Sequence, residues 1–98
     1  MSERDSILKR KVTYDVEIRR LLLQRIYPSQ LLDWMPCVYV GTKQEIQQIE
    51  RNQGQASAAA KFLDAVPNFA GWSEEFIDAL LTIGQKDIAN ILQNIFSV

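Results

Sequence analysis

The chain contains no histidine and only one cysteine, Cys37, among its 98 residues. Without a second cysteine it cannot form an internal disulfide, and without histidine the common zinc sites and the histidine-dependent catalytic arrangements are excluded. Cys37 has apolar neighbours and no histidine to activate it, so we interpret it as a buried thiol rather than a nucleophile. We therefore expect neither catalysis nor a cofactor or metal site.

Glycine and proline are also scarce, at four and three residues, while 47% of the residues are hydrophobic and 23% are charged. This composition is typical of one folded domain rather than a disordered tail. No apolar run approaches the roughly 18 to 20 residues that span a bilayer, and the first residues lack the apolar centre of a secretory signal. We expect a cytoplasmic protein with no membrane contact.

The net charge of −1 is unevenly distributed. Residues 1–25 carry seven Lys or Arg against four Asp or Glu (+3), and the remainder carries four against eight (−4). Such asymmetry favours either a nucleic-acid surface or two complementary faces on which copies of the domain attract one another. A sequence pI near 5.3 argues against nucleic acid. Nucleic-acid binding through a basic N-terminal helix is therefore kept as the alternative interpretation.

Apolar residues recur at spacings of three and four in several segments, which is the pattern of amphipathic helices. Ile18, Leu22 and Ile26 predict a helix over about residues 15–26. If that helix continued straight back, Lys11 and Asp15 would lie on its apolar side, and burying charge is costly. We therefore expect a kink or a new start near residues 13–15, with Asp15 as a possible N-cap.

Pro28 is expected to open a short helix that Pro36 ends. Residues 37–40 have strand-like side chains but no second strand to pair with, so we interpret them as an apolar connector packed against the helices. Thr42 and Glu45 form a capping box that predicts the start of a further helix. A segment rich in alanine, residues 56–65, predicts the next one.

The clearest pattern lies in residues 71–92, where two apolar stripes follow each other around a minimal turn. Ser73 is the expected N-cap of the first stripe's helix, and Gly84 is the expected left-handed residue that ends it. Six short helices with short connections predict an all-α antiparallel bundle. Its expected core consists of Ile18, Leu22, Ile26, Leu32, Ile49, Phe62, Leu63, Trp72, Phe76 and Leu80.

Four segments carry a family resemblance: residues 31–36, 45–49 and 59–63, and Gly71-Trp72 followed by 76–80 and Gly84. In this order they resemble a caspase-recruitment domain (CARD) of the death-fold superfamily, and they are most similar to the CARDs of RIG-I-like receptors. The resemblance covers roughly residues 18–92. We divide the chain into residues 1–12, an extension or the first half of a kinked first helix, and residues 13–98, a single CARD-like domain.

The resemblance implies a non-enzymatic signalling module that binds other CARDs and copies of itself, and that in many relatives stacks into helical oligomers. It implies a role in innate immune (antiviral RNA-sensing) or apoptotic signalling. Polyubiquitin is a partner by resemblance only. The chain has no Walker A pattern, so an excised N-terminal module and a short adaptor-like protein both stay open.

In CARDs, a surface on the first and fourth helices commonly meets one on the second and third helices of a neighbour. Carried onto this sequence, the basic face would comprise Arg20 and Lys61, with Arg19 at its margin. The acidic face would comprise Asp33, with Glu45 and Glu50 beside it. A possible further contact face comprises Trp34, Glu74, Glu75 and Asp78, whose carboxylates we expect to point outward into solvent.

Overall fold

The structure is a computed structural model, and it describes residues 2–97 as seven α-helices with one 3-10 turn and no strand. The elements are α1 (Glu3–Tyr14), α2 (Val16–Arg25), α3 (Pro28–Leu32), α4 (Val40–Gln53), α5 (Gln55–Ala65), η1 (Val66–Asn68), α6 (Trp72–Thr82) and α7 (Lys86–Ile95). The predicted all-α fold is confirmed, and the seventh helix arises because the expected first helix is broken into α1 and α2.

The break between α1 and α2 falls at Asp15, as predicted. The Asp15 carboxylate accepts a hydrogen bond of 3.1 Å from the amide of Ile18 and so caps α2. It also forms an ion pair of 3.5 Å with Lys11 on α1. These interactions lower the pKa of Asp15, with the hydrogen bond from Ile18 as the main cause.

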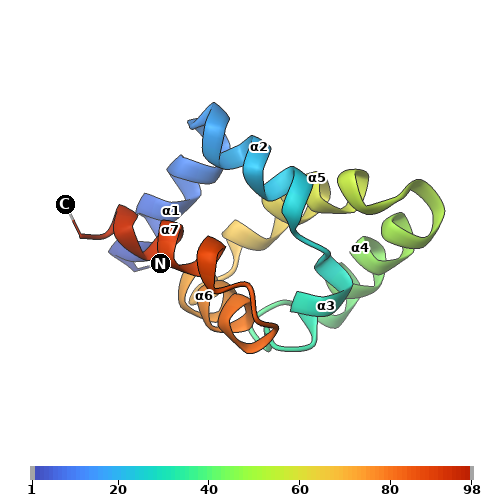
Figure 1. The fold of residues 1–98 in the computed structure, drawn as a ribbon. Helices are drawn as coiled ribbons and strands as arrows, with labels where there is room; N and C mark the ends of the chain where they lie inside the picture. The colour runs from blue at the N-terminus through green and yellow to red at the C-terminus, as the bar shows by residue number, and fades with distance from the viewer. Residues whose placement is uncertain (1, 98) are drawn as a thin grey trace.

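The helices are arranged in pairs around one apolar core (Figure 1). α4 packs along α5, α6 along α7, and α1 contacts both α2 and α6. In Figure 1 the break between α1 and α2 lies at the top of the domain, while α3 lies at the lower right. Eight of the ten predicted core residues are fully or almost fully buried; Ile18 and Ile49 are only partly buried and pack at the edge of the core.

Two predicted helix starts are wrong. α4 begins at Val40, with Tyr39 as its N-cap, so Thr42 lies inside the first turn and does not cap the helix. Tyr39, the N-cap residue of α4, packs edge-to-face on Phe69, with ring centroids 5.0 Å apart. Cys37 and Val38 of the expected connector do pack inward, whereas Tyr39 and Val40 are largely exposed.

The N-cap position of α6 is Gly71, whose left-handed backbone (φ 84°) suits glycine, rather than Ser73. Ser73 is buried because its amide and hydroxyl both donate to the carboxylate of Asp5 on α1, at 3.0 and 2.5 Å. The amide of Gly71 donates to the same carboxylate at 2.8 Å. A side chain from α1 therefore performs the capping role that the sequence assigned to Ser73.

Candidate protein-interaction surface

The three residues of the predicted basic face differ in how free their charges are. Arg20 is exposed on α2, and its side chain has no ion pair or hydrogen bond within residues 2–97. Arg19 donates to the carbonyl of Val12 at 3.1 Å and to Asp64 at 3.2 Å. Lys61 on α5 lies 3.3 Å from a carboxylate oxygen of Glu45 on α4. Arg20 is thus the basic residue of this set most available to a partner.

The predicted acidic face contains one free carboxylate. Asp33 follows α3, is exposed, and has no side-chain partner among residues 2–97. Glu50 accepts hydrogen bonds from the amide of Ser29, at 3.2 Å, and from its hydroxyl. Glu45 is engaged with Lys61, although the sequence analysis placed those two residues on opposite faces. The two predicted faces therefore share an edge between α4 and α5.

In the possible further contact face, too, some side chains are free and one is engaged inside the domain. Trp34 is 55% exposed, and Glu74 and Asp78 also point into solvent. Glu75 does not point outward as expected, because its carboxylate accepts a hydrogen bond of 2.9 Å from the amide of Cys37. Burial and then Glu75 raise the pKa of the Cys37 thiol to about 12, so a thiolate nucleophile is disfavoured there.

Exposed apolar side chains lie on either side of the helix break, where no periodic pattern indicated a contact surface. Tyr14 is 79% exposed and Val16 is 66% exposed. Large apolar side chains that water surrounds are candidates for contact with another molecule when they cluster. The available signal was Asp15 itself, because a predicted break leaves its flanking residues outside the apolar stripes of both helices.

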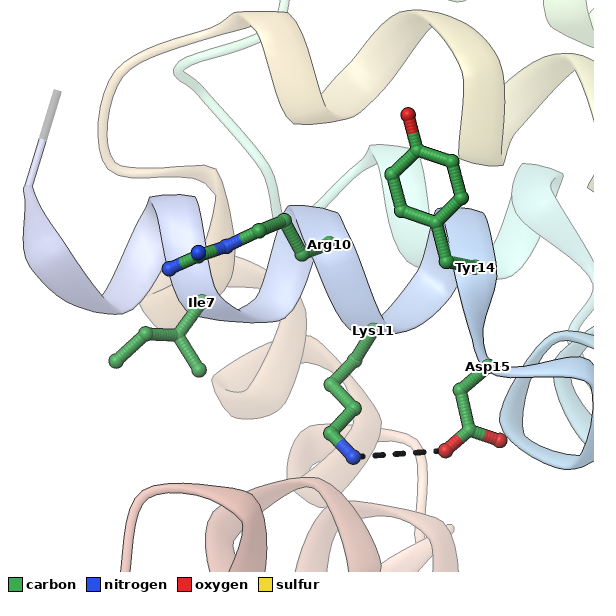
Figure 2. Close-up of a pocket in the computed structure, with 5 residues that line it drawn as sticks. All are labelled: Ile7, Arg10, Lys11, Tyr14 and Asp15. Atoms are coloured by element: carbon green, nitrogen blue, oxygen red, sulfur yellow. Dashed lines mark hydrogen bonds and ion pairs between the residues drawn. The ribbon is translucent and has the colours of Figure 1, made fainter.

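Two hollows adjoin Tyr14. The larger, about 420 Å³, lies along α1 and is shown in Figure 2, where Ile7 and Lys11 point to one side of the helix and Tyr14 to the other. The Lys11–Asp15 ion pair is part of its wall. The smaller, about 250 Å³, is lined by Thr13, Tyr14, Val16, Arg19, Arg20 and Leu23; we call it the break groove.

Most cations of the basic N-terminal region have partners inside the domain. These pairs are Arg4 over the ring of Phe96 at 5.0 Å, Lys9 with Asn68 at 3.0 Å, Lys11 with Asp15, Arg19 with Asp64, and Arg25 with Asp87 at 2.9 Å. The pairing with Arg25 also lowers the pKa of Asp87. The three pairs with carboxylates, at Lys11, Arg19 and Arg25, reduce the charge available to phosphates, and they weigh against the nucleic-acid interpretation.

Within residues 2–97 no group of three or more Cys, Asp or Glu side chains is placed to hold a metal ion. None of the described helices is long and apolar enough to cross a membrane. Among the exposed apolar side chains, Tyr14 and Val16 line a hollow with the unpaired Arg20, and Trp34 directly follows the unpaired Asp33.

Comparison with curated proteins and with solved structures finds no match. A family model described as "Caspase recruitment domain" matches residues 10–96, which is most of the 98-residue chain and spans all seven helices except the start of α1. The all-helical fold agrees with this match. The chain therefore belongs to the caspase recruitment domain family, whose members are protein-interaction modules of signalling pathways.

Proposed function

We propose that this CARD acts without catalysis in the cytoplasm, binding other CARDs and further copies of itself, and that the copies stack into helical oligomers. The pathway we propose is innate immune (antiviral RNA-sensing) or apoptotic signalling. The family match supports association with other CARDs. The finer proposal rests on one observation: Arg20 and Asp33 are both exposed and unpaired within residues 2–97, and Arg20 lies on α2 whereas Asp33 follows α3.

The placement of α2 and α3 supports a head-to-tail contact. α2 starts at the top of the domain in Figure 1, and α3 lies at the lower right. A contact between two different surfaces leaves one of each free at every step, so it closes into a ring or continues as a helical stack. One exposed ion pair contributes only about 0 to 1 kcal/mol, so apolar contacts must contribute as well.

Charge reversal tests this contact directly. Arg20→Glu and Asp33→Lys each reverse an exposed charge that has no internal partner, so both variants should fold like the parent. Each alone should weaken self-association, measured by light scattering at low salt, and an equimolar mixture should restore part of it through the reversed pair. Lys61 and Glu45 are unsuitable for this test, because reversing either places two like charges 3.3 Å apart in one molecule.

A matched control is Lys86→Glu, which reverses an exposed charge at the start of α7. It should leave association unchanged. Self-association of the parent should decrease as salt rises, since exposed charges are screened over about 8 Å at 0.15 M ionic strength. A parent that is monomeric at every salt and protein concentration would contradict self-assembly. Tight binding of double-stranded RNA with a steep salt dependence would instead favour the nucleic-acid alternative.

A further inference from the structure

The break groove is an apolar hollow with a cationic edge. Tyr14, Val16 and Leu23 supply its apolar wall, and Leu23 also packs against the core. Arg19 and Arg20 supply the cationic edge, where Arg20 has no partner within residues 2–97. A guanidinium next to an apolar hollow favours an aromatic side chain that carries negative charge beside it, because cations interact with aromatic faces as well as with carboxylates.

Trp34 has these properties. It lies in the turn after α3, directly next to Asp33, and it is 55% exposed, whereas the other tryptophan, Trp72, is fully buried. An indole is rigid and largely apolar, so tryptophans that are exposed in a free protein are frequent anchors of interfaces. Trp34 and Asp33 together present an aromatic side chain and a carboxylate on adjacent residues.

From this complementarity we infer that Trp34 of one copy inserts into the break groove of the next copy, which places Asp33 beside Arg20. The inference rests on the proposed self-association and identifies its apolar contact. Trp34 does not line the groove of its own chain, and α3 and the α1–α2 break lie at different ends of the domain (Figure 1). A second copy is therefore the source of the indole.

The larger hollow beside Tyr14 is a poorer site for the same indole. Its wall includes the Lys11–Asp15 ion pair, visible in Figure 2, and covering that pair would remove two charges from water without a new partner. The break groove has no carboxylate among its lining residues. Arg19 at its edge is already paired with Asp64, whereas Arg20 is unpaired and can pair with the exposed carboxylate of Asp33. The unpaired Arg20 favours this groove over its neighbour.

Tryptophan fluorescence of the unmodified protein tests the insertion without a variant. Trp72 is buried in the free domain, so the neutral quencher acrylamide should quench mainly Trp34. On self-association at low salt and high protein concentration, Trp34 should become protected from acrylamide, and its emission should shift to shorter wavelength. Trp72→Phe, if it folds, assigns the signal to Trp34 alone.

Substitution provides a second measurement. Trp34→Ala on one side and Val16→Gln on the other should each weaken self-association by at least about 10-fold, as expected for the centre of an interface, while their thermal midpoints stay near that of the parent. Trp34→Phe should retain part of the association. Ile91, an exposed apolar residue on α7, supplies the controls: Ile91→Ala and Ile91→Gln should have little effect.

The effects of Trp34→Ala and Val16→Gln should also be less than additive in the double variant, because both remove the same contact. The insertion is wrong if the parent assembles while Trp34 stays accessible to acrylamide. It is also wrong if Trp34→Ala and Val16→Gln weaken self-association no more than their Ile91 controls. In those cases the charge-reversal results on Arg20 and Asp33 still decide the proposed function. A parent that never assembles would overturn both the insertion and the proposed self-association.

Discussion

Asp5→Ala removes the carboxylate by which α1 caps α6. Asp5 is only 1% exposed, and it accepts three hydrogen bonds, from the amide of Gly71 and from the amide and hydroxyl of Ser73. All three donors lie in the first residues of α6 or just before it. In the alanine variant these three donors lose their acceptor, and the positive end of the helix dipole loses its nearby anion.

The expected loss follows from the number and burial of these donors. Each buried donor that loses its acceptor costs about 1 to 3 kcal/mol. A hollow of about 300 Å³ lies beside Asp5, Gly71 and Ser73, so water should replace part of the lost bonding. We therefore expect a loss of about 3 kcal/mol in the free energy of unfolding, which corresponds to a melting temperature lower by roughly 12 to 24 °C in a domain of this size.

Thermal unfolding followed by circular dichroism measures this loss. Glu3→Ala is the matched control, because Glu3 is an exposed acid in the same turn of α1 and its side chain makes no hydrogen bond within residues 2–97. If the midpoint of Asp5→Ala lies within about 3 °C of the Glu3→Ala midpoint, Asp5 does not hold α1 to α6 and the reasoning is refuted.

The same comparison has a defined pH dependence. Burial alone would raise the pKa of Asp5, but the hydrogen bonds from Ser73 and Gly71 outweigh it and lower the pKa below its ordinary value of 3.8. A carboxylate whose pKa is lower in the folded state stabilises the fold above its unfolded pKa, and this contribution is lost as pH falls through the folded value. The difference between the parent and Asp5→Ala should be complete at pH 7 and shrink below about pH 4.

Three further outcomes are expected. Trp72→Ala should cost about 3 to 5 kcal/mol in urea unfolding, since Trp72 is fully buried and stacks on its neighbour in α6; Trp72→Phe should cost much less, because the indole Nε1 has no partner within residues 2–97. A chain that starts at Arg10, where the family match starts, should show no cooperative unfolding, because it lacks Asp5 and the fully buried Leu8. Cys37 should react with thiol reagents at pH 8 far more slowly in the native protein than in urea, since its native pKa is about 12; equal rates would contradict this.

The spacing of apolar residues was sufficient to predict the buried side chains where a helix has one apolar stripe. Leu22 and Ile26 in and after α2, and Trp72, Phe76 and Leu80 in α6, are all fully buried, because positions three and four apart must share a face of a helix. Ile18 belongs to the same stripe as Leu22, but it lies in the first turn after the break, where the helix reaches the edge of the core.

The errors concern groups whose partners lie far away in the sequence. Ser73 has the residue type of an N-cap, but the competing acceptor is a carboxylate 68 positions earlier, and no local pattern reveals it. The ion pair between Lys61 and Glu45 was not foreseen for the same reason, because α4 and α5 pack side by side and bring these charges together. Local sequence shows which residues are charged, whereas packing determines which charges remain free.

The helix break connects the fold to the proposed contact. On a continuous helix, residues two positions apart point to nearly opposite sides, so Tyr14 and Val16 could not line one groove. They do so because α1 ends at Tyr14 and Asp15, in an extended conformation, caps a new helix that begins at Val16. Asp15, whose charge made a continuous straight helix unfavourable, is therefore also the residue that creates the break groove. An interaction through this groove depends on the break itself, and not only on the side chains exposed beside it.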